Sequence, residues 1–498
     1  MKIEIESSIN KYYVQTLCMI FFPGEKFSGN DENTDEPYLY IKTDSDDEGI
    51  STYAKLVYQG NEVEATRRSD YSVSRTKERT LKLSVGAAVL ACGSELLGYN
   101  PAWGMLVGVR PSKVATEMLN LGISKTKVKK ILTSDYLVIP KKASLAIDVA
   151  LNEKRITGTP SSKDCSLYIS IPFCPSRCTY CSFVSYTSSR LLSLIPSYLE
   201  RLLKDIETNF KIINDLDLNL KTIYIGGGTP TILDADQLRL LLEKISSLTD
   251  VSLLEEFTLE SGRPDTITEE KMAIAKSYGV NRVCVNPQTL CDDILCGIGR
   301  NHSVEDFYRA YEIAKNAEIN TVNVDLIVGL PGDNFKIFSK TFENILKLDP
   351  ENITVHTFCV KKSSDFRRMH SNPYDLRGTD TGKCVDYTQL KAIQNSYLPY
   401  YMYRQKNAMG NYENVGFSKE GHEGLYNIYM MEELHSIFAS GAGAVTKLVD
   451  NRNIDSQENT KKIVRLFNQK YPYEYLAEDK SEEFYKSAID FYNEHNLI

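Results

Sequence analysis

The sequence lacks an excess of basic residues. Its 498 residues include 58 lysines and arginines against 66 aspartates and glutamates, which gives a net charge of −8 at pH 7. Proteins that coat nucleic acid need a basic surface to neutralise phosphates. We therefore expect no nucleic-acid partner, and an enzyme that modifies RNA is a remote hypothesis.

A long uninterrupted hydrophobic run is also missing. The most apolar stretch, Leu81–Tyr99, is broken by Lys82 and Glu95 among other polar residues, so we expect no membrane span. The N-terminal MKIEIESSIN has no apolar core of the kind found in secretion signals. Hydrophobic residues make up 42% and charged residues 25%, as in ordinary globular proteins, and we expect a cytoplasmic location.

Cysteine is present in an odd number, and histidine is scarce. Eleven cysteines in a chain without a secretion signal make a poor disulfide framework, and the six histidines include no His-x3-His pair. Eight cysteines are scattered, whereas Cys174, Cys178 and Cys181 lie together in IPFCPSRCTYCSF. Three thiolates so close in sequence can surround a metal centre.

Zinc and an iron–sulfur cluster are the two metal centres to weigh. Structural zinc usually takes four ligands from two separated pairs, and no second CxxC pair is present. Three cysteines on a [4Fe–4S] cluster would leave one iron open for a small molecule, and we favour this interpretation. We expect no second cluster, because Cys284, Cys291 and Cys296 follow an x6–x4 spacing that fits no cluster pattern.

The chain length predicts about three structural units, at roughly 150 residues per domain. Residues 1–75 predict a β-rich region, in which YYVQTLCMIFF (12–22) is expected to be a strand. A helical periodicity follows over residues 76–160, where Pro111 is expected to open a helix.

Strand and helix patterns alternate over residues 161–362. Strand patterns lie at 167–171, 221–225, 256–260, 281–286, 321–328 and 352–358, and helical patterns at 194–213, 235–247, 268–278, 304–316 and 335–347. Six β–α units in succession predict an α/β fold, a partial (β/α)6 barrel with helices outside a parallel sheet.

Residues 363–498 predict a mixed α/β region that covers the substrate. A helix is expected near 380–395, followed by a tyrosine-rich strand in PYYMYRQK. The tail from residue 457 is expected to form amphipathic helices.

Chemistry-bearing residues cluster at the predicted strand ends, where barrel-like folds place their active sites. The three cysteines follow the first strand, and the second strand ends in Gly226-Gly227-Gly228-Thr229-Pro230. Glu260 ends the third strand, Gln288 and then Arg300 follow the fourth, and Asp325 lies in the fifth.

These motifs resemble those of a known family. Cys174-x3-Cys178-x2-Cys181, with Tyr180 before the third cysteine, resembles the signature of radical S-adenosylmethionine (SAM) enzymes. GGGTPT, the Gln288–Arg300–Asp325 spacing and DLIVGLPG narrow the resemblance to the oxygen-independent coproporphyrinogen III dehydrogenases (oxidases). WGMLVGVRPSK, ESGRPDTIT and NPQTL are most similar to the HemZ-like branch, and NVGFSKEG and SGAGA extend the likeness to about residue 445.

The resemblance implies a [4Fe–4S] cluster and one or two molecules of SAM as cofactors. Cys174, Cys178 and Cys181 would hold the cluster, and reduction of SAM there would release a 5′-deoxyadenosyl radical. The residues implied to line SAM are Tyr168, Tyr180, Gly227, Gly228, Thr229, Glu260, Gln288, Arg300 and Asp325. Tyr168 and Glu260 are also placed to contribute to a second SAM. Cys359 falls near a further adenosyl contact, although a structural role as a small buried residue is favoured.

The implied reaction converts two propionates of coproporphyrinogen III to vinyl groups, giving protoporphyrinogen IX. A tetra-anionic substrate needs cationic contacts, for which the candidates are Arg110, Lys113, Lys361, Lys362, Arg367, Arg368, Arg404 and Lys406. The resemblance further implies an electron donor such as flavodoxin or ferredoxin, and we expect a monomer.

Three departures from the family pattern keep one alternative open. Phe183 stands where dehydrogenases carry a further cysteine, Ser170 stands where a histidine is common, and ESGRP replaces an ExNP-like element. Heme-trafficking relatives share these changes. A heme chaperone on the same scaffold, with His356 and His422 as candidate heme ligands, is therefore the alternative. It ranks second because such relatives tend to begin near the cluster cysteines, whereas this chain has a long region before them.

Overall fold

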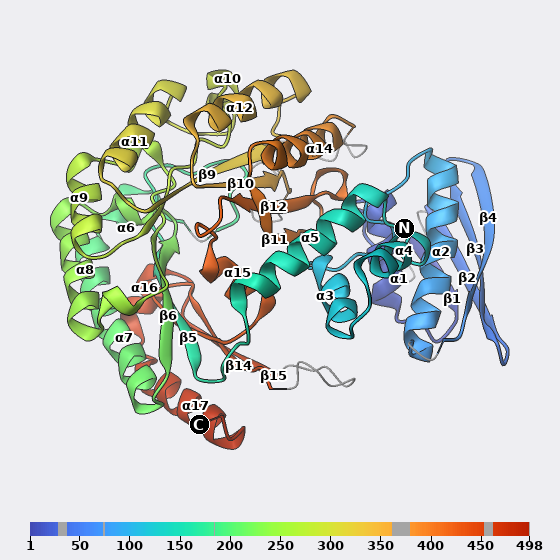
Figure 1. The fold of residues 1–498 in the computed structure, drawn as a ribbon, viewed down its shortest axis with the longest axis horizontal. Helices are drawn as coiled ribbons and strands as arrows, with labels where there is room; N and C mark the ends of the chain where they lie inside the picture. The colour runs from blue at the N-terminus through green and yellow to red at the C-terminus, as the bar shows by residue number, and fades with distance from the viewer. Residues whose placement is uncertain (28–36, 73–74, 184, 361–378, 453–461, 498) are drawn as a thin grey trace.

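The computed structural model describes residues 1–27, 37–72, 75–183, 185–360, 379–452 and 462–497. The described strands form two sheets, one of four strands and one of eleven. Figure 1 shows the smaller sheet, in blue, at one side of the molecule and the larger sheet with its helices at the other. The division into regions ending at residues 75, 160 and 362 stays a prediction.

The four-stranded sheet is built from the N-terminal residues in the order β1-β2-β3-β4. Its strands are β1 (Lys2–Glu6), β2 (Tyr38–Ser45), β3 (Gly49–Tyr58) and β4 (Asn61–Asp70). β1 pairs with β2 in parallel, and the other pairs are antiparallel. Helices α1 (Lys11–Phe21) and α2 (Lys77–Leu97) pack against each other, and α2 packs on β3 and β4.

Helix α1 corrects the strand predicted over residues 12–22. Asn10 caps the helix, because its side chain accepts a hydrogen bond of 2.8 Å from the Tyr12 N–H. Val14, Leu17, Cys18 and Phe21 are buried, which is the i, i+3, i+4, i+7 spacing of a helix face. The β-branched and aromatic composition suggested a strand, but packing of this face decides the structure.

Helix α2 is long and apolar enough, by length and composition alone, to cross a membrane, although Lys82 and Glu95 led us to expect no membrane span there. In the part of the chain that the structure describes, it is the one helix to meet that test, and 61% of the apolar window is buried. The buried side chains include Leu81, Val85 and Leu90, which belong to the hydrophobic core. The apolar face of α2 therefore serves the packing of the N-terminal sheet.

Three further helices lead from this unit to the larger sheet. They are α3 (Ser112–Asn120), α4 (Lys125–Ser134) and α5 (Pro140–Thr157), and α3 begins directly after Pro111, as predicted. Figure 1 shows α5 running toward the larger sheet, where it packs on β11. Buried Lys142 on α5 lies 2.6 Å from Glu413 Oε1 and 3.1 Å from Asp386 Oδ1, so an ion-pair network joins the N-terminal helices to the C-terminal region.

Six parallel strands form the centre of the larger sheet, as the alternating pattern predicted. In chain order they are β5 (Asp164–Ile171), β6 (Asn219–Gly227), β7 (Glu256–Leu259), β8 (Arg282–Cys284), β9 (Thr321–Val328) and β10 (Asn352–Thr357), each hydrogen-bonded to the next. The helices between them are α6 (Ser189–Leu192), α7 (Ile195–Asp215), α8 (Ala235–Leu248), α9 (Glu269–Ser277), α10 (Asp292–Gly297), α11 (Val304–Asn316) and α12 (Phe335–Leu348). The arrangement is the predicted partial barrel.

C-terminal strands extend this sheet at both edges. Antiparallel β12 (Glu413–Ser418) and β11 (Leu398–Arg404) follow β10, whereas parallel β13 (Ser436–Ser440) pairs with β5 and leads to antiparallel β14 (Val445–Asp450) and β15 (Lys462–Phe467). In the described residues β11 and β15 end the sheet without pairing to each other, so the barrel is open.

The remaining C-terminal elements match the prediction in part. The helices are α14 (Thr379–Gln394), α15 (Leu425–Glu432), α16 (Pro472–Ala477) and α17 (Ser481–Glu494). The tail was predicted to be helical from residue 457, but β15 is a strand because it pairs with β14 along six residues.

Candidate functional site

The three clustered cysteines lie in the loop between β5 and α6. Cys174 and Cys178 are buried, and Cys181 is partly exposed. The backbone fixes this loop, since the Cys174 N–H donates to the Tyr186 carbonyl at 3.1 Å and the Cys181 N–H donates to the Cys178 carbonyl at 3.1 Å. The Thr179 N–H donates to Ile298 O at 3.0 Å, which ties the loop to the end of α10.

The chemistry of this loop fits an iron–sulfur cluster. Burial raises the pKa of the Cys174 thiol to about 11 and also raises that of Cys181, so the thiolate forms need a nearby cation. Iron supplies that charge. Among the described residues, no three His, Cys, Asp or Glu side chains converge as ligands of a single ion would. A cluster does not require such convergence, because each thiolate binds a different iron.

The glycine run at the end of β6 packs directly on the cysteine loop. Gly228 donates its N–H to Ile171 O at 2.8 Å, and Thr229 donates to Phe173 O at 2.8 Å. A Cβ on Gly228 would lie 2.5 Å from Phe173 O, so only glycine allows this approach. Thr229 Oγ1 lies 3.2 Å from Cys174 Sγ, which brings this predicted SAM residue to a predicted cluster ligand.

Two acidic residues lie on either side of Asn286, Glu260 directly after β7 and Asp325 within β9. Glu260 Oε1 accepts a hydrogen bond of 2.9 Å from Asn286 Nδ2, and its other oxygen accepts one from the Tyr224 hydroxyl. The Asp325 N–H donates to Asn286 Oδ1 at 3.1 Å, so Asn286 connects the two acidic residues. Burial, together with the charge of Asp325, raises the pKa of Glu260.

The pKa of Asp325 moves in the opposite direction. Burial alone would raise it, but His356 outweighs burial with help from Asn323 and Thr354, and the pKa is held below its ordinary value. His356 Nε2 lies 3.5 Å from Asp325 Oδ2, and Asn323 Nδ2 donates to Oδ1 at 2.7 Å. One acidic residue with a raised pKa and one with a lowered pKa are typical of a functional site.

Gln288 presents an unsatisfied acceptor. The residue is buried in a left-handed backbone conformation with φ 69°, and its Oε1 atom has no hydrogen-bond partner. Its backbone pairs with β9, since the N–H donates to Asp325 O at 3.1 Å and the carbonyl accepts from Ile327 N at 2.9 Å. An acceptor held so rigidly without a partner fits a ligand that donates a hydrogen bond.

Arg300 joins the cysteine loop to the end of β8. Its Nη1 donates to Asn286 O at 2.8 Å and to Gly262 O at 3.2 Å, while Nη2 donates to the Tyr180 hydroxyl at 3.3 Å. Arg300 Nε is buried without a partner. The structure thus brings into contact Tyr180 and Arg300, two residues that the family resemblance implies to line SAM.

An aromatic stack lies next to the carboxylates. Tyr168 of β5 stacks on Tyr224 with ring centroids 6.2 Å apart and on Tyr426 at 6.1 Å, and Tyr224 and Tyr426 are 4.7 Å apart. Tyr224 also contacts Glu260, so Tyr168 and Glu260 belong to one continuous wall.

Two residues of this site were missed at the sequence level, Arg263 and Asn286. Arg263 is buried, and its Nη1 lies 3.7 Å from Cys178 Sγ while Nη2 donates to Ser176 Oγ at 2.9 Å. Asp265 holds the same guanidinium with bonds of 2.9 and 3.0 Å. The replacement of the family's ExNP-like element by ESGRP was the available signal for Arg263.

Replacement of Arg263 by glutamine is expected to lower the reduction potential of the cluster by about 40 mV. The N–H···S hydrogen bond stabilises the more negative reduced state, and a hydrogen bond worth about 1 kcal/mol corresponds to that shift for one electron. The measurement is an EPR-monitored redox titration, with Arg263→Lys expected to fall between glutamine and wild type. An unchanged potential with normal iron content would show that Arg263 does not act on the cluster.

Other predicted residues lie outside this assembly. His422 Nδ1 contacts Thr321 Oγ1 at the amino end of β9, away from the cysteines, whereas His356 lies beside Asp325. Cys284 is buried and Cys296 is exposed, and with Cys291 they form no metal-ligand group among the described residues. Buried Cys359 donates to Lys406 O at 3.0 Å.

The candidate substrate cations are dispersed. Arg110 donates to Met431 O at 2.7 Å and pairs with Glu433 at 3.2 Å, and Lys113 lies 4.0 Å from Glu117. Arg404 and Lys406 line a separate cavity. The other four lie outside the described residues: Lys361, Lys362, Arg367 and Arg368.

Comparison with known proteins agrees with this geometry. Residues 168–345 match the model of the radical SAM superfamily. The oxygen-independent coproporphyrinogen-III oxidase-like protein HemZ of Bacillus subtilis is 36% identical over 76% of this chain and 75% of its own length. The chain belongs to the radical SAM superfamily. Radical SAM proteins bind a [4Fe–4S] cluster through cysteines, together with SAM, and these are the cofactors of this protein.

One further relative and one solved structure are similar to this radical SAM protein. The heme chaperone HemW of Bacillus subtilis is 31% identical over 64% of this chain and 80% of its own length. Among solved structures, coproporphyrinogen III oxidase (HemN) from Escherichia coli aligns with a TM-score of 0.47 and 17% identity, covering 64% of this chain and 74% of that chain.

Proposed function

We propose that this protein catalyses the oxidative decarboxylation of two propionates of coproporphyrinogen III to vinyl groups, giving protoporphyrinogen IX without oxygen. The observation that carries the proposal is the 36% identity to the HemZ protein over three quarters of both chains. Three features of the site support the proposal, because they could hold the cofactors: the cysteine loop, the unpaired Gln288 acceptor and the Glu260–Asp325 pair.

We assign Cys174, Cys178 and Cys181 as the cluster ligands. Once bound, the cluster and SAM supply hydrogen-atom abstraction. Gln288 Oε1 would accept a hydrogen bond from SAM, and the Glu260 and Asp325 carboxylates would accept from its hydroxyl or ammonium groups. Gly227, Gly228 and Thr229 would border SAM beside the cysteines. Arg300 and Tyr180 hold the loop in place, and the tyrosine stack excludes water from one side.

The reaction balances for each propionate as the loss of one hydrogen atom, one electron and carbon dioxide. The hydrogen atom leaves the β-carbon and is carried away on 5′-deoxyadenosine. The Cα–carboxylate bond then breaks, carbon dioxide departs, and one electron passes to an acceptor as the vinyl double bond forms. The initial electron comes from an external donor of the flavodoxin or ferredoxin type, acting on a monomer.

Anaerobic incubation with SAM, a reductant and coproporphyrinogen III is expected to yield protoporphyrinogen IX with two 5′-deoxyadenosines per product, measured by liquid chromatography with mass spectrometry. Omission of SAM is the control. A reconstituted protein with a full cluster and bound SAM that forms no vinyl product would contradict the proposal.

A heme chaperone is the second candidate, because a HemW protein is 31% identical and Phe183 replaces the family's additional cysteine. Phe183 is exposed beside the cysteine loop. Under this alternative, heme titration would give a Soret shift that His356→Ala weakens and His422→Ala does not, without turnover of coproporphyrinogen III.

A further inference from the structure

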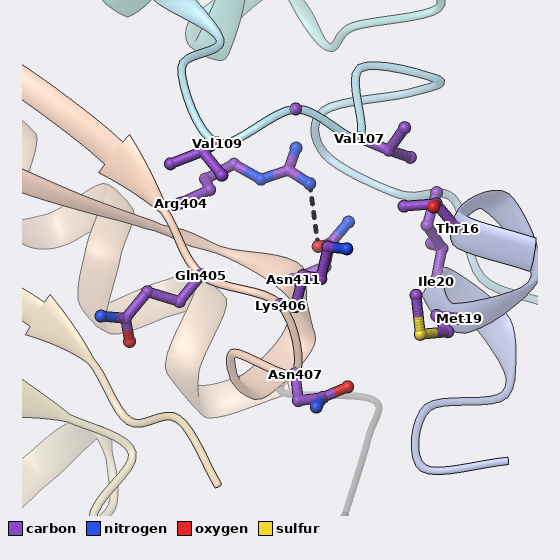
Figure 2. A pocket seen from close by; sticks show the side chains of 11 residues that line it. Thr16, Met19, Ile20, Val107, Val109, Arg404, Gln405, Lys406, Asn407 and Asn411 are labelled. Atoms are coloured by element: carbon purple, nitrogen blue, oxygen red, sulfur yellow. Dashed lines mark hydrogen bonds between the residues drawn. The ribbon is translucent and has the colours of Figure 1, made fainter. Parts of the chain in front are cut away.

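A small cavity of about 30 Å³ lies between α1, the 107–109 loop and the end of β11. None of the residues that line it belongs to the cluster or SAM assignments above. The lining side chains come from the N-terminal unit and from the 404–411 segment, and Figure 2 shows Arg404 and Asn411 facing each other across from Thr16, Met19 and Ile20. A cavity of this size has room for about two water molecules, or for a group of similar size such as a carboxylate, and not for a whole small-molecule ligand.

Two hydrogen-bond donors at this cavity are unpaired. Arg404 is 4% exposed, its Nη1 donates to Leu106 O, and its Nη2 donates to Asn411 Oδ1 at 2.9 Å. Arg404 Nε and Asn411 Nδ2 are both buried without a partner. Buried donors are nearly always satisfied, so two of them beside one cavity indicate a missing acceptor.

The charge around Arg404 favours an anion. In the described part of the chain, no carboxylate lies within ion-pair distance of its guanidinium, and Glu413 nearby already pairs with Lys142 at 2.6 Å. Burial lowers the pKa of Arg404 to about 10, and the negative charge of nearby Glu413 offsets only part of that shift. Lys406 adds a second cation to the lining and lies over the Tyr12 ring at 4.4 Å.

The same segment also borders the open end of the barrel. Met409 donates its N–H to Phe358 O at 2.8 Å, and Ala408 pairs with Cys359, immediately after β10. Parallel strands all end at one edge, so the carboxyl end of β10 lies on the same edge as the cysteine loop after β5. The cavity and the cysteine loop therefore lie toward the same edge of the sheet.

We propose that this cavity binds a carboxylate through Arg404 Nε and Asn411 Nδ2. The favoured source is a propionate of the tetrapyrrole, and in that respect the inference rests on the proposed function; a free small carboxylate is the other source. Arg404 provides a positive charge, and the Asn411 amide provides a directional hydrogen bond that orients the carboxylate.

The test uses Asn411→Leu, with circular dichroism as the check on folding, because Asn411 has a φ of 59° and accepts a hydrogen bond from Arg404. Asn411→Asp is the second variant: it keeps an acceptor for Arg404, replaces the Nδ2 donor with a carboxylate oxygen, and should weaken coproporphyrin III binding in the same way. The probes are coproporphyrin III, its tetramethyl ester and glutarate, applied to the full-length anaerobic holoprotein. Asn411→Leu is expected to weaken coproporphyrin III binding about 10-fold by fluorescence quenching, since it removes one hydrogen bond to a charged group. Ester binding should be unchanged, and the matched cavity variant Gln405→Leu should bind both porphyrins as wild type does.

The outcomes separate the two sources and the proposed function. If glutarate raises the melting temperature of wild type but not of Asn411→Leu, while porphyrin binding is unaffected, the carboxylate is a free one and the site stands. If Asn411→Leu alters the binding of neither coproporphyrin III nor glutarate, the site assignment is wrong. If the assay above gives no vinyl product but carboxylate binding still depends on Asn411, the proposed decarboxylation is refuted and the proposed carboxylate site stands.

Discussion

Replacement of Cys178 by alanine is expected to reduce bound iron from about four atoms per chain to less than about one, and SAM cleavage to background. Cys178 is the middle cysteine of the loop and the one that Arg263 contacts at 3.7 Å. Loss of one of three thiolates leaves two protein ligands for four irons, and no other described cysteine is grouped with them. Iron and sulfide analysis after anaerobic reconstitution, with detection of 5′-deoxyadenosine, measures both effects.

Cys296→Ala is the matched control for this experiment. Cys296 is exposed on α10, two residues before Ile298, which accepts a hydrogen bond from the cysteine loop. The Cys296→Ala variant should therefore retain wild-type iron content and activity. Circular dichroism would establish that Cys178→Ala remains folded. Wild-type iron content in Cys178→Ala would refute its assignment as a ligand, whatever the product assay shows.

Replacement of Lys142 by methionine is expected to destabilise the protein by about 3–5 kcal/mol, because it leaves buried carboxylates without their cation. The Lys142 and Glu413 side chains are fully buried and 2.6 Å apart. Burial lowers the pKa of Lys142, but Glu413 and Asp386 outweigh it and raise the pKa overall, so the ammonium stays charged at neutral pH. Urea unfolding followed by tryptophan fluorescence measures the loss of unfolding free energy. Trp103 reports on this network because its Nε1 donates to Glu413 at 2.7 Å.

Lys141→Met provides the control, because Lys141 also contacts Asp386 at 3.1 Å but is 70% exposed. An exposed ion pair contributes at most about 1 kcal/mol, so this variant should unfold near the wild-type midpoint. The double variant Lys142→Met with Glu413→Gln should recover part of the stability, because the buried negative charge is then removed. Equal unfolding midpoints for Lys141→Met and Lys142→Met would contradict the buried network.

Periodicity and strand-end motifs predicted the core of the fold. Each of the six β–α units depends on residues adjacent in sequence, so the pattern alone identifies it, and the cysteine, glycine and acidic motifs fall at strand ends. Helix α1 was missed because its β-branched and aromatic residues favour strands until their burial is known.

Long-range pairing set the limit of prediction elsewhere. β13 and β12 join the core sheet at opposite edges, through partners that no local pattern identifies. In the site, too, local motifs could be predicted from the sequence and long-range contacts could not. The cysteine spacing indicated a cluster, but the Arg263 contact with Cys178 and the bridge that Asn286 makes between Glu260 and Asp325 arise only when three strands meet.

The pairing of β5 with β13 has a consequence for how the chain acquires its structure during synthesis. Ser170 of β5 donates its hydroxyl hydrogen to Ala442 O, a contact across 272 residues of sequence. The first barrel strand thus keeps an unpaired edge until almost the whole chain has left the ribosome, and contacts of such separation form slowly. Chains shortened before β13 would expose this edge and aggregate. In the full chain, β13 would pair with β5 late in folding, so the strand that leads into the cysteine loop would be fully paired only among the last events.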